Sequence, residues 1–266
     1  MARRRRRNDG GHWAVLGGVG LLLVVLAVGG AAAYFKINAH VMDAETLCPA
    51  EGPLGHVVVL VDKTDPLNFT QNEAFQVLLE KIITQEVAPG ELVSVFALGE
   101  DYKTTAKPLI EICNPGDGSD KNALTSNVKR LKRQFSERFR SPLLAVSNEL
   151  QAQHPADHSP LLEMIQLVSI NGFRAHGIEQ NRRLIIVSDM LHNTPEFSMY
   201  KGTYDYAAFS GTPYGRKMQV ELPGVSVELH YVLNSPLLQT RRHLKFWEDY
   251  FSRAGAKVVA VRPMEG

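Results

Sequence analysis

Short runs of consecutive apolar residues alternate with longer amphipathic stretches along most of the chain. The run at residues 57–61 contains four valines and one leucine, which is typical of a strand buried on both faces. Similar runs predict further strands at residues 92–98, 109–113, 184–187, 227–233 and 257–261. Because helix-length segments separate most of these runs, we expect βαβ units and an α/β fold, with a doubly wound, mainly parallel sheet and helices on both faces.

Capping residues mark where the predicted helices begin. Thr70 and Glu73 have the spacing of a capping box. The apolar face of the helix that follows is predicted to consist of Ala74, Val77, Leu78 and Ile82. Ser159 and Pro160 have the order of an N-cap and a first-turn proline, and so predict the start of a later helix.

The N-terminal residues follow a different pattern. Five consecutive arginines, residues 3–7, precede 23 residues without a charge, residues 13–35. A helix of that length extends about 34 Å, which is enough to cross a ~30 Å hydrocarbon core. We therefore expect a single transmembrane helix at residues 13–35. By the positive-inside rule, residues 1–12 are a cytoplasmic basic tail and the rest is extracytoplasmic, or periplasmic in a bacterium. A cleaved signal peptide ending near Ala33 is the alternative.

Composition and charge narrow the class of protein further. The chain has 266 residues, of which 44% are hydrophobic and 21% charged, as expected for a globular protein of one or two domains. Residues 1–35 carry five Arg and one Asp, whereas the remaining 24 basic and 27 acidic residues give a net charge of −3. We therefore expect no nucleic-acid partner. Residues 36–55, with several Pro, Gly and acidic residues, predict a linker, and residues 56–266 a single extracytoplasmic domain.

Two of the predicted strands lead directly into acidic turns. Asp62, Thr64 and Asp65 follow the first strand, and Asp189 follows a later one. Ligands of parallel sheets bind outside the carboxyl ends of the strands, so these turns are expected to converge with Ser159 at one edge of the sheet. Oxygen ligands without His or Cys suit Mg²⁺, or else Mn²⁺ or Ca²⁺.

At these residues the chain resembles the von Willebrand factor A-like (vWA) family. The metal-ion-dependent adhesion site of that family consists of D-x-S-x-S after the first strand, a Thr in a later loop and an Asp after the fourth strand. Asp62 matches the first Asp, and Thr64 replaces the first Ser. Ser159 stands for the Thr, and Asp189 for the last Asp. The resemblance implies a protein-binding module, not an enzyme, in which these four residues hold Mg²⁺ and a partner's carboxylate fills an open position on the metal.

The resemblance covers about residues 56–262 and departs from the family's pattern at one position. Pro66 stands where the second Ser belongs and cannot ligate a metal through its side chain, whereas Asp65 adds a carboxylate beside it. A metal-free structural domain therefore stays an alternative. A metal-dependent phosphohydrolase with Asp62 as nucleophile is another, although Thr64 occupies the place of the second Asp in the D-x-D-x-T motif.

From these residues we expect a membrane-anchored, vWA-like binding or scaffold module of a cell-envelope assembly, with a protein partner. Residues 191–224 leave the sheet after Asp189, on the ligand side, and are rich in aromatic residues. Long loops are often functional, and Tyr and Phe are enriched at interfaces. Partner contacts are therefore expected from Tyr200, Tyr204, Tyr206 and Phe209, and a short helix that packs these rings into the core is the alternative.

Two further predictions concern the cysteines and the surface. Cys48 and Cys113 are the only cysteines, and outside the membrane they are expected to form a disulfide, with two separate buried thiols as the alternative. A basic helical stretch contains Lys129, Arg130, Lys132, Arg133, Arg138 and Arg140. It is either a solvated helix face or a contact for an acidic partner or anionic headgroups. His192 lies near a predicted loop and is expected at the surface.

Overall fold

The computed structural model describes residues 23, 25–30, 42–103, 106–121, 127–151, 156–202 and 204–265. The chain divides into two compact units, Met1–Val41 and Met42–Gly266. The described residues of the first unit are helical. Among the helices of the described residues, none combines the length and apolar character that crossing a membrane requires. The predicted cytoplasmic tail and most of the predicted transmembrane helix lie outside the described residues.

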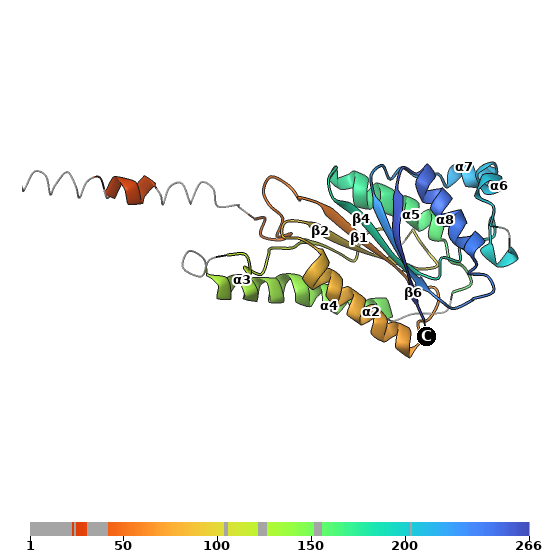
Figure 1. Ribbon diagram of the computed structural model, residues 1–266, viewed down its shortest axis with the longest axis horizontal. Helices are drawn as coiled ribbons and strands as arrows, with labels where there is room; N and C mark the ends of the chain where they lie inside the picture. Colours follow the sequence, from red (N-terminus) through yellow and green to blue (C-terminus); the bar gives the residue numbers. More distant parts are fainter. Residues whose placement is uncertain are drawn as a thin grey trace, which may run out of the picture. The chain divides into compact units, whose positions relative to one another are not determined.

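A six-stranded sheet forms the centre of the second unit (Figure 1). Its strands are β1 (His56–Asp62), β2 (Leu92–Leu98), β3 (Ile110–Cys113), β4 (Arg182–Ser188), β5 (Ser226–Val232) and β6 (Lys257–Met264). In space the order is β3-β2-β1-β4-β5-β6, and every neighbouring pair is parallel except β2 and β3. This is the order of a doubly wound sheet, which confirms the predicted fold class. The strand order reverses between β1 and β4, and we call that position the switch point.

Helices cover both faces of the sheet (Figure 1). One face is covered by α2 (Phe69–Lys81) and α4 (Ser141–Gln151), and the other by α5 (Leu161–Leu167), α6 (Tyr206–Ser210), α7 (Pro213–Lys217) and α8 (Arg241–Arg253). The remaining helical segments are α3 (Val128–Gln134), the π-helical turns Ile82–Glu86, Phe135–Arg140 and Val168–Arg174, and the 3₁₀ turn Met199–Lys201. Side chains of β1 alternate between the two covered faces, Val59 toward α2 and Leu60 toward α5. Both faces are buried, which explains the continuous apolar runs.

The helix after β1 begins two residues before the predicted capping box. Asn68 is its N-cap, and its side chain and that of Gln71 each accept a hydrogen bond from the other's backbone amide at 3.0 Å. Thr70 and Glu73 therefore lie inside the first two turns and do not cap the helix. Val77, predicted on the apolar face, is 69% exposed.

Residues 42–55, predicted as part of a linker, pack onto the domain. Leu47 is fully buried, and the Cys113 amide donates a hydrogen bond to the Thr46 carbonyl at 2.8 Å. A disulfide joins Cys48 to Cys113, which confirms that prediction. The compact unit therefore begins at the start of this segment, because its buried side chain and its covalent bond hold it against β3.

Removing the disulfide should destabilise the domain. In the chain-entropy model, a bond that spans 65 residues stabilises the folded state by about 4 kcal/mol. We expect the Cys48→Ala/Cys113→Ala variant to unfold at a correspondingly lower denaturant concentration than the oxidised wild type. A reducing agent should lower the wild-type midpoint and leave the variant unchanged. An unchanged wild-type midpoint on reduction would contradict the expectation.

Candidate functional site

Asp62, the last residue of β1, connects three segments of the chain at the switch point. The Ser188 hydroxyl at the end of β4 donates a hydrogen bond to Asp62 Oδ2 at 2.8 Å, and the Ser159 hydroxyl before α5 lies 3.4 Å from the same oxygen. Thr64 donates twice to Asp62 Oδ1, from its amide at 2.9 Å and from its hydroxyl at 2.6 Å. The acidic turns after β1 and β4 are therefore neighbours, as the strand pattern predicted.

The hydroxyl groups around Asp62 are oxygen donors of a type that can bind a metal. A hydroxyl has one proton and two lone pairs, so the Thr64 and Ser159 oxygens keep their lone pairs when they donate to Asp62. The Ser188 oxygen uses one of its lone pairs to accept the Met190 amide at 2.8 Å. Asp62 is only 7% exposed. Burial raises the pKa of its carboxyl group, and the hydrogen bonds from Thr64 and Ser188 offset part of that rise. Ser188 was not among the predicted site residues. Its position directly before Asp189, at the end of the same strand, could have identified it.

Asp65 and Asp189 form a pair of carboxyl groups beside Asp62. The two side chains lie close enough for each carboxyl group to shift the pKa of the other. Burial raises the pKa of Asp189 well above its usual range, and the negative charges of Asp62 and Asp65 raise it further. Asp189 Oδ1 accepts the Leu191 amide at 2.8 Å, but no donor group of the described residues reaches its buried Oδ2. No basic side chain of the described residues forms an ion pair with Asp65 or Asp189, so the negative charge of the two carboxyl groups is uncompensated.

A divalent cation fits this donor set. Among the described residues, no Lys, Arg or His forms an ion pair with any of the three carboxyl groups, and a cation would relieve their mutual repulsion. No group of three His, Cys, Asp or Glu side chains in the described part of the chain is arranged to hold a metal by itself. Hydroxyl oxygens would therefore complete the set, which is a ligand type that Mg²⁺ and Ca²⁺ accept.

The loop after β4 is held in a constrained conformation. Two backbone hydrogen bonds of 2.8 and 2.9 Å pair Asn193 with Ser159. Met190 has a φ of 62°, which is rare for a residue other than glycine, and its side chain is fully buried. The Gln239 side chain donates to the Asp189 carbonyl at 3.1 Å. Backbone strain of this kind persists only where the surroundings enforce it, and it is concentrated at functional sites.

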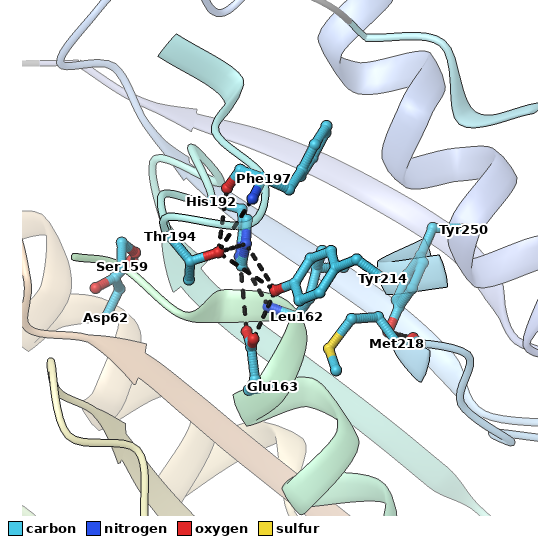
Figure 2. A network of polar contacts seen from close by, with 10 residues as sticks. All are labelled: Asp62, Ser159, Leu162, Glu163, His192, Thr194, Phe197, Tyr214, Met218 and Tyr250. Carbon is cyan, nitrogen blue, oxygen red and sulfur yellow. Dashed lines mark hydrogen bonds and ion pairs between the residues drawn. The ribbon is translucent and has the colours of Figure 1, made fainter. Parts of the chain in front are cut away.

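A buried polar network holds the same loop against α5 and α7 (Figure 2). His192 Nδ1 accepts the Leu162 amide at 3.3 Å, so the ring proton is on Nε2, which faces the Tyr214 and Thr194 hydroxyls at 3.1 and 3.2 Å. Tyr214 in turn donates to Glu163 Oε1 at 2.5 Å. Burial lowers the pKa of His192 to about 3. The prediction of a surface residue is wrong for His192, because its ring is a fully buried, neutral part of this network.

The four aromatic residues predicted to contact a partner differ in exposure. Tyr200 is 45% exposed, and partial burial raises the pKa of its hydroxyl group, with a further contribution from the negative charges of Asp189, Asp65 and Asp62. Tyr204 and Tyr206 are half-buried and pack edge-on against aromatic rings of α8. Phe209 is only 5% exposed and belongs to the core, which corrects its assignment as a partner contact.

Known proteins match this chain in structure but not in sequence. A comparison with known protein families finds no match, and no curated protein is similar in sequence. Among solved structures, the VWA domain of SpRpn10 is similar, with 8% identity and a TM-score of 0.36 over 80% of this chain and 88% of that chain. Human COPII-coat protein Sec24c is also similar, with 9% identity and a TM-score of 0.39 over 81% of this chain and 30% of that chain. Both TM-scores are below 0.5, so these similarities do not assign the fold. The fold class is assigned from the strand order and register of this chain.

Replacing one member of the carboxyl pair should stabilise the metal-free protein in a pH-dependent way. Asn at position 189 keeps the acceptor for the Leu191 amide and can donate to Asp65 without a charge. An acid whose folded-state pKa is raised costs stability as pH rises above its unfolded value of about 3.9. In EDTA, Asp189→Asn should therefore raise the free energy of unfolding more at neutral pH than at about pH 4.

Denaturation curves across that pH range measure this gain. Glu248→Gln, on the exposed face of α8, is the matched control and should give no such trend. A gain for Asp189→Asn that is absent, or equal at every pH, would contradict the repulsion inferred for the pair.

Removing the Tyr214 hydroxyl should weaken the network in Figure 2. Tyr214→Phe leaves a buried Glu163 oxygen without its donor, which typically costs about 1–3 kcal/mol. Tyr200→Phe, at an exposed ring, should change stability by less than about 0.5 kcal/mol. Urea denaturation of the two variants checks both values, and equal effects would be evidence against a structural role for the network.

Proposed function

We propose that the chain is a protein-binding module whose switch-point site holds a divalent cation. The observation that carries the proposal is the cluster of Asp62, Asp65 and Asp189, in which Asp189 Oδ2 is buried without a hydrogen-bond partner and the Thr64, Ser159 and Ser188 hydroxyls surround Asp62. Ligands of doubly wound sheets bind at the switch point, so the cluster lies where a binding site is expected. Mg²⁺ is the proposed cation, with Mn²⁺ and Ca²⁺ as substitutes.

The cation would be held by Asp62, Thr64, Ser159 and Asp189. When bound, it supplies an electrophilic centre with a position open to a partner's carboxylate, as the resemblance to the vWA family implies. Asp65 lies beside Asp189, and a bound cation would offset the repulsion that raises the pKa of Asp189. The loop bearing Asp189 is fixed by its pairing with Ser159, so the site is largely preformed.

A phosphohydrolase is less well supported by the same geometry. Both oxygens of Asp62 already accept hydrogen bonds, from Thr64 and from Ser188, and the residue is 7% exposed. A nucleophilic carboxylate needs an unobstructed approach to its substrate, whereas a metal ligand needs only one of the lone pairs that remain on a hydrogen-bonded carboxylate oxygen. Thr64 also cannot supply the proton that the second Asp of such an enzyme supplies. Binding without turnover is therefore the proposed activity.

Exposed apolar side chains at the same edge of the sheet form the proposed partner surface. Tyr200, Phe69 and Leu237 are 45%, 76% and 93% exposed. A hydrogen bond of 3.2 Å between Gln71 and Asn234 joins the start of α2 to the loop after β5, which brings the segments bearing Phe69 and Leu237 together. Large exposed apolar residues grouped beside a polar site are typical of protein interfaces.

We further propose that residues 13–35 anchor the domain in a membrane, with the domain on the extracytoplasmic side. The uncharged segment and the five arginines before it support this arrangement. The disulfide between Cys48 and Cys113 supports an oxidising compartment, since such bonds are rare in the cytosol.

Millimolar Mg²⁺ should raise the melting temperature of the wild-type chain and leave Asp62→Ala unchanged. A ligand that binds only the folded state stabilises it by mass action, by about 2.7 kcal/mol at a hundredfold excess over Kd. Affinity-purified wild-type chain should retain its partner from detergent-solubilised membranes in Mg²⁺ and lose it in EDTA. Glu248→Gln serves as the control that keeps both properties.

Two results would contradict the proposed function. Melting curves that Mg²⁺, Mn²⁺ and Ca²⁺ all leave unchanged would favour the metal-free structural domain. Hydrolysis of p-nitrophenyl phosphate above the rate of an Asp62→Asn control would establish the phosphohydrolase instead.

A further inference from the structure

Positive charge is concentrated in α3 and the π-helical turn that follows it. Residues 127–140 contain six basic residues and one acidic residue, Glu137. Two of the basic side chains have structural partners: Arg140 forms an ion pair with Glu80 at 2.8 Å, and Arg138 donates a hydrogen bond to the Ala44 carbonyl. The other four are exposed and, within the described part of the chain, form no ion pair: Lys129, Arg130, Lys132 and Arg133.

Packing against the domain does not explain this charge density. No residue of α3 is buried, although Leu131 lies against Gly118 in the loop before the helix. Hydrogen bonds from Ser119 lower the pKa of Asp117, and the charge of Lys132 lowers it further, so Asp117 offsets part of the positive charge of this helix. Like charges three and four residues apart on a helix repel each other and destabilise it. A surface of opposite charge would remove that repulsion.

The helix lies at the end of the domain where the chain enters it. The hydrogen bond from Arg138 to Ala44 joins the turn after α3 to residues 42–55, and Figure 1 shows α3 and that segment at the same end of the second unit. Seven peptide steps separate Phe35, at the end of the predicted anchor, from Met42. Fully extended, they span at most about 25 Å. If residues 13–35 anchor the chain, this short segment keeps the entry end of the domain within about 25 Å of the membrane.

We infer that α3 docks on the anionic lipid headgroups of the membrane that residues 13–35 cross. The inference rests on the proposed anchor. Exposed Lys and Arg are attracted to anionic headgroups in the leaflet that the domain faces, and the attraction acts only within a Debye length of about 8–10 Å. Two attachments, the anchor and α3, would then fix the orientation of the domain and keep the switch-point site directed toward its partner.

Hydrogen exchange of the full chain in nanodiscs tests the docking. Backbone amides of residues 128–134 should exchange at least about fivefold more slowly in discs containing phosphatidylglycerol than in discs of phosphatidylcholine alone. High salt should remove the difference, because the Debye length falls to about 3 Å at 1 M. A variant with Gln at the four exposed basic positions of α3 should show no difference between the discs.

A matched variant separates docking from a general effect of charge. Arg241→Gln/Arg242→Gln/Lys245→Gln removes three exposed basic residues from α8 and should keep the protection of α3. Equal exchange of α3 in the two kinds of disc would overturn the inference. Protection by added polyglutamate in neutral discs, without protection by phosphatidylglycerol, would overturn it in favour of an acidic protein partner.

The anchor is tested by itself in lipid vesicles of the same two compositions, with and without phosphatidylglycerol. A chain that alkaline carbonate removes from both kinds of lipid vesicle would refute the anchor, whereas one that stays in both but shows no protection of α3 would refute the docking alone.

Discussion

The burial of Asp62 at the end of β1 is the constraint on which the surrounding loops depend. A carboxylate that is almost excluded from water is tolerated only when hydrogen-bond donors surround it. Its donors come from its own turn, from the end of β4 and from the residue before α5, which are up to 126 residues away in sequence. The sheet order makes this possible, because β1 and β4 are adjacent and parallel. One buried charge thus determines how three segments meet.

The fold was largely predictable because its strands are buried on both faces. Such strands consist of consecutive β-branched and apolar residues, as in β1, and this pattern is visible without any tertiary information. The start of α2 was harder to predict, because Asn68 with Gln71 and Thr70 with Glu73 are both reasonable capping pairs. Residues 42–55 have the composition of a linker, and their place in the domain depends on a disulfide and on one buried leucine.

The candidate site was predictable only in part. Asp62 and Asp189 each follow a strand, so the doubly wound pattern was sufficient to bring them together. The network of His192, Tyr214 and Glu163 joins residues that are 22 and 51 positions apart on loops and short helices, for which periodicity gives no register. Phe209 and Tyr200 are both aromatic residues of the same long segment, but Phe209 is buried and Tyr200 is exposed. Burial within such a segment depends on how it folds back onto α8.

The disulfide also determines how the domain responds to mechanical force. Tension applied through the N-terminal segment passes at Cys48 across the covalent bond to Cys113 and so bypasses the chain between them. That bypassed chain contains β1 and β2. With a separation of 65 residues, roughly 220 Å of contour length is withheld from extension while the bond is intact. Asp62 lies within the segment that the disulfide closes, so tension on the N-terminal residues cannot pull β1 lengthwise out of the sheet.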